Sequence, residues 1–157
     1  MPQSVAALPD SIPRAAAFAA RNASQGRRTA GGRIEDLPGY NDGAWWIQDA
    51  AAAIPATLLG SLKGKTVIDL CAAPGGKTAQ LAAQGANVIA VDLAFERMKR
   101  VRTNLERLNL KADIQVGDAL TWRPKEQADA VLLDAPCTAS GTVRRHPDVL
   151  WRKDFSD

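Results

Sequence analysis

Two short stretches of the sequence concentrate the residue types that carry chemistry. The first, residues 69–78, reads Asp-Leu-Cys-Ala-Ala-Pro-Gly-Gly-Lys-Thr, and the second, residues 134–141, reads Asp-Ala-Pro-Cys-Thr-Ala-Ser-Gly. A cysteine thiolate can act as a nucleophile, a carboxylate can accept protons or hydrogen bonds, and paired glycines let a ligand approach the main chain closely. Because each stretch follows an apolar run, both are expected at the carboxyl ends of strands.

The glycine-containing stretch lies between an apolar run and an alanine-rich helical pattern. A strand, a glycine turn and a helix start let backbone N–H groups face a bound ligand. Gly75 and Gly76 permit unusual backbone angles, and Pro74 fixes one dihedral ahead of them. The spacing matches neither GxGxxG nor GxxxxGK[ST], so an ordinary dinucleotide or ATP site fits poorly. The turn favours a nucleotide-like ligand, although a purely structural turn can also contain two glycines.

Four aspartates stand at the ends of predicted strands: Asp69, Asp92, Asp118 and Asp134. In an open α/β sheet the ligand lies outside these ends. Asp92 follows the glycine turn by about twenty residues, where an acidic side chain can accept hydrogen bonds from ribose hydroxyls. Asp118 is placed to reach an adenine, and Asp134 points toward the place of reaction. A nucleoside ligand without phosphates fits this pattern, and S-adenosylmethionine is the candidate.

Cys137 follows a proline at the end of the fourth predicted strand, beside the expected cofactor. It could be a nucleophile if it is present as a thiolate. A buried and inert cysteine is the common alternative. The only histidine, His146, stands beside Arg144 and Arg145, a context that favours a loop or phosphate contact over a general base.

The elements that must position these residues alternate along the chain. Short apolar runs predict buried strands over residues 66–70, 87–91, 112–116 and 128–133, and helical patterns predict helices over 78–84 and 95–108. Gly85 is expected to end the first of these helices. Met98, Val101, Leu105 and Leu108 fall on one face of the second. Strands that alternate with helices indicate βαβ units, a parallel sheet and an α/β fold.

The part of the chain before the first of these strands is less regular. Residues 1–36 are expected to be a flexible or residual segment, in which 14–21 could form a short helix. Residues 37–43 predict two successive turns. Trp45 and Trp46 are expected to anchor a helical segment over 48–62 in the core, with a kink or break at Pro55. Base stacking is the alternative role of the tryptophans.

The composition is ordinary for a globular protein of one domain. Lysine and arginine number 20 against 17 aspartates and glutamates, and a formal net charge of +3 supports nucleic-acid binding only weakly. The two cysteines suggest neither a disulfide framework nor a metal site, which is typical of a reducing cytoplasm. No apolar run could span a bilayer, and the N-terminus lacks a secretory signal. Its alanine- and arginine-rich composition leaves an organelle transit peptide open.

Together the two stretches resemble the Sun-type RNA cytosine-5 methyltransferases, in particular the bacterial branch that acts on small-subunit ribosomal RNA. The likeness covers about residues 37–154 and includes Leu-Pro-Gly-Tyr at 37–40, Val-Asp-Leu at 91–93, Gly-Asp-Ala at 117–119 and Arg-Arg-His-Pro-Asp at 144–148. It implies a Rossmann-like methyltransferase fold, with residues 37–157 as the N-terminal part of the catalytic domain. The chain would supply the first four strands of a parallel sheet with helices on both faces.

The resemblance also implies S-adenosylmethionine as cofactor and a role for each matching residue. Asp92 would bind the ribose with Arg97 nearby, Asp118 would lie near the adenine, and Asp134 would sit beside the methyl donor and the target base. The methionine part of the cofactor would be wrapped by Cys71, Ala72, Ala73, Pro74, Gly75, Gly76 and Lys77.

In the family reaction a thiolate adds to carbon 6 of cytosine, carbon 5 takes the methyl group, and loss of the carbon 5 proton expels the enzyme. The attacking cysteine of the family resembles one in a Thr-Cys-Ser stretch, and the cysteine that matches Cys137 is implicated in product release. DNA cytosine methyltransferases attack with a Pro-Cys cysteine instead. For this chain Cys137 as the attacker is therefore the competing assignment.

The sequence departs from the family pattern in one respect. No Thr-Cys-Ser stretch occurs in its 157 residues. We therefore expect a partial catalytic domain without turnover of its own, with the strand over 128–133 as an open sheet edge. A non-catalytic RNA-binding module that retains the cofactor pocket, a methyltransferase that uses Cys137, and a truncated product without function are the alternatives.

Overall fold

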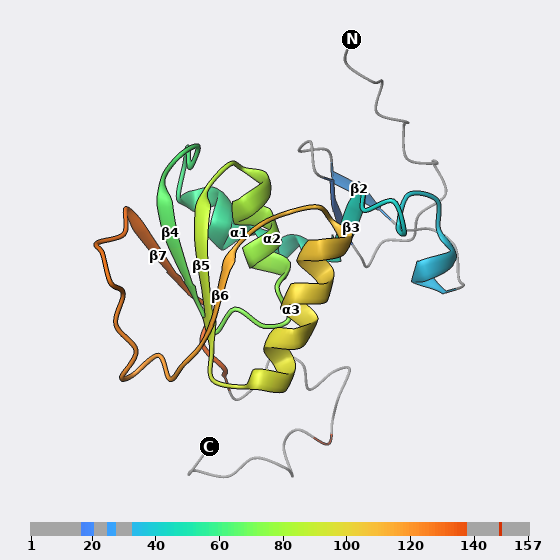
Figure 1. Ribbon diagram of the computed structural model, residues 1–157. Helices are drawn as coiled ribbons and strands as arrows, with labels where there is room; N and C mark the ends of the chain where they lie inside the picture. The colour runs from blue at the N-terminus through green and yellow to red at the C-terminus, as the bar shows by residue number, and fades with distance from the viewer. Residues whose placement is uncertain (1–16, 21–24, 28–32, 138–147, 149–157) are drawn as a thin grey trace.

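The computed structural model describes residues 17–20, 25–27, 33–137 and 148. Its centre is a four-stranded parallel sheet in the order β6-β5-β4-β7 (Figure 1). The strands are β4 (Thr66–Leu70), β5 (Asn87–Asp92), β6 (Asp113–Val116) and β7 (Ala130–Leu133). All four predicted strands are therefore confirmed, with the two later ones starting one or two residues further along the chain.

Three α-helices cover one face of this sheet: α1 (Ala50–Leu58), α2 (Gly76–Ala83) and α3 (Phe95–Arg107) (Figure 1). Val67, Val88 and Leu132 point to this face and pack with Ala56 of α1 and Leu81 of α2. Ala90, on the same side of β5 as Val88, packs with the buried side of α3. The predicted apolar face of α3, Met98, Val101, Leu105 and Leu108, is buried as expected.

The expectation of helices on both faces is not met within the described part of the chain. There, the connection between β6 and β7 contains turns and irregular backbone but no helix. At the edge strand β7, Val131 is 53% exposed and Leu133 is 60% exposed on the face away from the helices. Within the described part of the chain, no layer covers these apolar side chains on this side of β7.

A second sheet lies beside the helices and has the antiparallel order β2-β1-β3 (Figure 1). It is formed by β1 (Ala17–Ala20), β2 (Gln25–Arg27) and β3 (Trp45–Gln48), and the 3₁₀ helix η1 (Ile34–Asp36) precedes β3. The short helix suggested over 14–21 is therefore wrong for Ala17–Ala20, which pair with β3 instead. No helix in the described part of the chain is long and apolar enough to cross a membrane.

Trp45 and Trp46 are buried, which confirms them as core residues, but they belong to β3 rather than to the following helix. The helix starts later than predicted because Asp49 is its N-cap and accepts a hydrogen bond from the N–H of Ala51 at 2.8 Å. It then runs through Pro55 to Leu58. Core packing of this segment outweighs the cost of an internal proline.

Arg107 ties the turns over residues 37–43 to the end of α3. Its Nη1 donates to the carbonyls of Tyr40 at 2.6 Å and Trp45 at 3.1 Å, and its guanidinium lies 3.9 Å from the centre of the Tyr40 ring. Gly43 allows the close approach: a Cβ there would lie 1.9 Å from the Arg107 carbonyl oxygen. The turn is thus packed directly against the helix backbone.

A pair of glycine substitutions tests this close approach. Gly43 and Gly60 both have left-handed backbone angles, with φ of +66° and +72°, but a Cβ at Gly60 would meet nothing within 4 Å. Gly60→Ala should therefore lower the free energy of unfolding by about 1 kcal/mol, the cost of a left-handed alanine. Gly43→Ala should lower it by about 3 kcal/mol or more, because the backbone must also shift. Urea unfolding measures both. Equal losses would contradict the packing of the turn on α3.

Candidate functional site

The glycine turn links β4 to α2 and contains two unusual backbone conformations. Cys71 has a φ of 62°, which is rare for a residue with a side chain, and Gly75 has a φ of 100° as the N-cap of α2. A Cβ at Gly75 would lie 3.3 Å from the Cα of Val101, so the turn is pressed against α3. Of the two glycines predicted to permit unusual backbone angles, Gly75 adopts one and Gly76 opens α2 without a positive φ.

A pocket of about 200 Å³ opens where β4 and β7 end. The predicted site residues that line it are Cys71, Ala72, Ala73, Pro74, Gly76, Lys77 and Asp134, and Asp69 joins them. Gly75 does not. It lines a second pocket of about 220 Å³ on the other side of the turn, together with Tyr40, Trp46 and Arg107.

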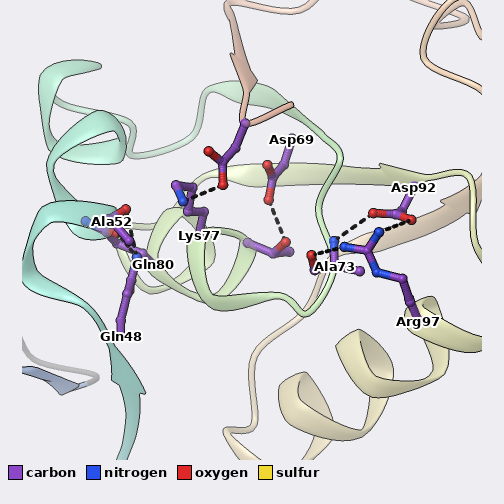
Figure 2. Close-up of polar contacts among 10 residues, drawn as sticks. Gln48, Ala52, Asp69, Ala73, Lys77, Gln80, Asp92 and Arg97 are labelled. Carbon is purple, nitrogen blue, oxygen red and sulfur yellow. Dashed lines mark hydrogen bonds and ion pairs between the residues drawn. The ribbon is translucent and has the colours of Figure 1, made fainter. Parts of the chain in front are cut away.

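Lys77 and Asp134 both line the first pocket and form an ion pair there. The Nζ of Lys77 lies 2.6 Å from Oδ2 of Asp134 (Figure 2). The lysine side chain is 14% exposed and the aspartate side chain is 55% exposed. The pair joins the first turn of α2 to the residue that follows β7. Because the aspartate is half exposed, its carboxylate remains accessible to a ligand in the pocket.

Asp69 is the most buried charged residue of the site, with an exposed fraction of 0%. Its Oδ2 accepts a hydrogen bond of 2.6 Å from the hydroxyl of Thr78, whereas Oδ1 has no partner among the described residues. Burial raises the pKa of Asp69 from 3.8 to about 6, against the opposing effects of the Thr78 hydrogen bond and the Lys77 charge. The sequence predicts the position of Asp69 at a strand end but predicts no role for its side chain.

Asp92 and Arg97 hold the turn at Ala73, a residue that lines the pocket. Oδ2 of Asp92 accepts a hydrogen bond of 3.1 Å from the N–H of Ala73, and Nη2 of Arg97 donates to the Ala73 carbonyl at 2.8 Å (Figure 2). Arg97 and Asp92 also form an ion pair of 3.7 Å. Neither side chain lines the pocket, so the structure brings both predicted residues to the turn but not into the cavity.

Asp118, the residue predicted to lie near the adenine, follows β6 and does not line this pocket. Its Oδ1 accepts a hydrogen bond of 2.9 Å from the N–H of Leu120 within a turn. The preceding Gly117 donates to the carbonyl of Asp92 at 3.1 Å, which ties the end of β6 to the end of β5. Asp118 is therefore near the Asp92 side of the site and does not line the cavity around Asp69.

The two cysteines occupy different environments. Cys71 lines the pocket, and burial, together with the charge of Asp92, raises the pKa of its thiol against the opposing effect of Arg97. A thiolate is therefore disfavoured at Cys71. Cys137 is exposed beyond β7, and the neighbouring residues 138–147, including Arg144, Arg145 and His146, lie outside the described residues.

A buried network of amides lies behind the turn, and one of its members, Gln48, lines the pocket; the sequence pattern does not predict this network. The Nε2 of Gln48 donates to Oε1 of Gln80 at 2.9 Å and to the carbonyl of Ala52 at 3.3 Å (Figure 2). The Nε2 of Gln80 donates to the carbonyl of Ala53 at 2.9 Å. Trp46 donates to Gln48 at 3.0 Å. The network connects β3, α1 and α2. The only signal for it in the sequence was uncharged polar residues within apolar segments.

The model of the family described as 16S rRNA methyltransferase RsmB/F matches residues 56–157, more than half of the chain. The chain belongs to this family. Relatives in the RsmB/F family include the ribosomal RNA small subunit methyltransferases B of Cronobacter sakazakii and Serratia proteamaculans, each 48% identical over 129 residues. These matches cover 79% of this chain and 30% of each relative, so the chain spans about a third of their length.

Solved structures agree with the RsmB/F assignment. A methyltransferase homologue from Pyrococcus horikoshii is 26% identical, with a TM-score of 0.67 over 85% of this chain and 54% of that one. The NSun6 protein from the same organism, solved with SFG, is 25% identical, with a TM-score of 0.63 over 82% of this chain and 41% of that one. The predicted Rossmann-like methyltransferase fold and the predicted membership of a Sun-type family are thus confirmed. This family uses S-adenosylmethionine.

The buried carboxylate of Asp69 predicts a pH-dependent stability difference. Its pKa of about 6 in the folded chain exceeds the ordinary value of 3.8. The free energy of unfolding of the wild type therefore falls as the pH rises from 3.8 to about 6. Asp69→Asn cannot titrate and should gain stability relative to wild type between pH 4 and 6, by up to about 3 kcal/mol. Urea unfolding of both proteins across this range measures the difference. A difference independent of pH would contradict the burial of an ionisable Asp69.

Proposed function

We propose that this chain binds S-adenosylmethionine in the pocket around Asp69, Lys77 and Asp134. We further propose that the protein acts on carbon 5 of cytosine in small-subunit ribosomal RNA. The observation that carries the proposal is the pocket itself, in which a strand-end carboxylate with an unused oxygen faces the glycine turn of an RsmB/F family member. A buried acceptor without a partner is a feature that a bound ligand can satisfy.

The charges of the pocket suit the cofactor. Asp69 and Asp134 are anionic and Lys77 is cationic, whereas S-adenosylmethionine carries a sulfonium, an ammonium and a carboxylate. The pocket thus offers partners for both signs of charge. Backbone groups of the turn, whose path is fixed by Asp92 and Arg97 at Ala73, would surround the methionine part. When bound, the cofactor supplies an electrophilic methyl group.

The residues of this chain would then have distinct roles. Asp134, half exposed and paired with Lys77, would contact both the cofactor and the target base. Asp92, Arg97 and Asp118, on the other side of the turn, would receive the ribose and adenine. Cys71 is unsuited to nucleophilic attack because its thiol pKa is raised. Cys137 remains the only other cysteine in the chain, either as the attacking thiol or as the group that releases product.

A substitution that fills the pocket tests the cofactor proposal. A Cβ at Gly76 would meet only Gln48, at 3.9 Å, so a larger side chain there extends into the cavity without backbone strain. Gly76→Val should weaken S-adenosylmethionine binding at least tenfold in titration calorimetry while leaving the urea unfolding midpoint nearly unchanged. Gly64→Ala, at an open position away from the pocket, is the control for binding: its left-handed φ of +76° should cost about 1 kcal/mol of stability, but its affinity should equal that of the wild type. No binding by the wild-type chain would reject the proposal.

A covalent trap tests the reaction. RNA that contains 5-fluorocytidine holds the attacking cysteine because the fluorine cannot leave as a proton does. We expect no 5-methylcytosine from the purified 157-residue chain with cofactor and small-subunit ribosomal RNA, because the family's Thr-Cys-Ser cysteine is not in this sequence. A covalent complex that disappears in Cys137→Ser would instead identify Cys137 as the attacker. RNA binding without transfer in any assay would favour a binding module.

A further inference from the structure

We propose that Asp69 is a proton-linked binding residue whose free oxygen accepts a hydrogen bond from the ammonium group at the amino-acid end of the cofactor. In its ionised form the residue binds this ammonium, and in its protonated form it does not. The inference rests on the proposed cofactor and deepens it, because it makes cofactor affinity depend on pH through one side chain.

The hydrogen bonds of Asp69 leave one oxygen for a ligand. Oδ2 is engaged by the Thr78 hydroxyl at 2.6 Å, and Oδ1 is buried without a partner in the described part of the chain. The residue has an exposed fraction of 0% and yet lines the pocket. An unpaired carboxylate oxygen in such a position is costly, and a cationic N–H donor is the partner that relieves this cost most strongly.

The charged neighbours of Asp69 do not satisfy it. Lys77, the only cation that lines the pocket in the described residues, is engaged with Asp134 at 2.6 Å. The charges of Asp134 and Asp92 oppose ionisation of Asp69, and Asp92 is itself occupied by Ala73 and Arg97.

Among the described residues, the other elements around the pocket add no charge. Cys71 follows β4 with a thiol whose raised pKa keeps it neutral, and Gln48 and Ala52, from β3 and α1, are uncharged. An incoming ammonium would therefore be the first cation available to the free oxygen of Asp69.

The direction of the pH effect follows from the burial of the carboxyl. Because the pKa of Asp69 is about 6, most of the unliganded chain holds a proton there at pH 5 and little does at pH 7. A bound ammonium favours the carboxylate and lowers its pKa in the complex. Binding then releases a proton below pH 6, so affinity should rise about tenfold between pH 5 and pH 7.

Titration calorimetry with the full chain and S-adenosylhomocysteine, which has the same amino-acid end, tests this expectation. The wild-type affinity should rise about tenfold from pH 5 to pH 7. The desamino analogue, in which hydrogen replaces the amino group, should bind equally at both values. Asp69→Asn should lose the pH dependence and bind about tenfold more weakly than wild type at pH 7. Asp129→Asn, at the far end of β4 where it accepts from the Thr66 N–H, is the matched control and should behave as wild type.

Thr78→Val provides an independent variant if Asp69→Asn does not fold. It removes the hydrogen bond that favours the ionised carboxyl of Asp69. The pH at which affinity rises should therefore increase by about half a pH unit or more. A purely structural Thr78 would lower affinity equally at every pH and would overturn the inference. A wild-type affinity that is flat from pH 5 to pH 7 would overturn it as well while leaving the cofactor proposal intact. Absence of any binding would reject both.

Discussion

The backbone of Ala73 is held at both its N–H and its carbonyl, and the geometry of the ligand-binding rim depends on these two hydrogen bonds. Asp92 accepts from its N–H at 3.1 Å and Arg97 donates to its carbonyl at 2.8 Å. Hydrogen bonds to charged groups are stronger than neutral ones, especially when partly buried. They fix the path between Cys71 and Gly75, both of which adopt unusual backbone angles. The end of β5 and the start of α3 thereby determine where α2 begins and what its first turn can contact.

The helices on one side of the sheet complete the support of this rim. Val101 of α3 packs against Gly75, and the Gln48–Gln80 amides link β3 and α1 to α2 behind the pocket. Each amide has its partners, so the network is rigid and specific in position. The turn is thus supported by apolar packing on one side and by hydrogen bonds on the other, while Oδ1 of Asp69, in the pocket, keeps no partner among the described residues.

The alternation of strands and helices after residue 65 could be predicted because each strand is a short apolar run and α3 has a clear buried face. The sheet of β1, β2 and β3 could not, since Ala17–Ala20 shows no alternation of apolar and polar residues that would identify a strand. The tryptophan pair was correctly predicted to be buried but assigned to the wrong element, because hydrogen bonds to β1 and the cap at Asp49 set the helix start.

The candidate site was predictable in part for a geometric reason. Strand-end acids were expected to converge, and Asp69 and Asp134 do so because β4 and β7 are neighbours. Asp118 follows β6, which is two strands away from β4, and adjacent strands are separated by about 4.8 Å. The order of strands decides which acids share a cavity, and this order cannot be read from the position of each acid along the chain. The unpaired oxygen of Asp69 likewise emerges only from its three-dimensional surroundings.

The pairing of β4 with β7 has a consequence for how this chain acquires its shape. Leu70 and Leu133 are partners in that parallel pair although the rest of the sheet lies between them in the sequence. Contacts of such long sequence separation form slowly, because a large loop must close before any stabilising interaction is gained. The Lys77–Asp134 contact belongs to the same closure. A ligand that needs both residues would recognise only molecules in which this closure is complete, and its binding would therefore report on that closure.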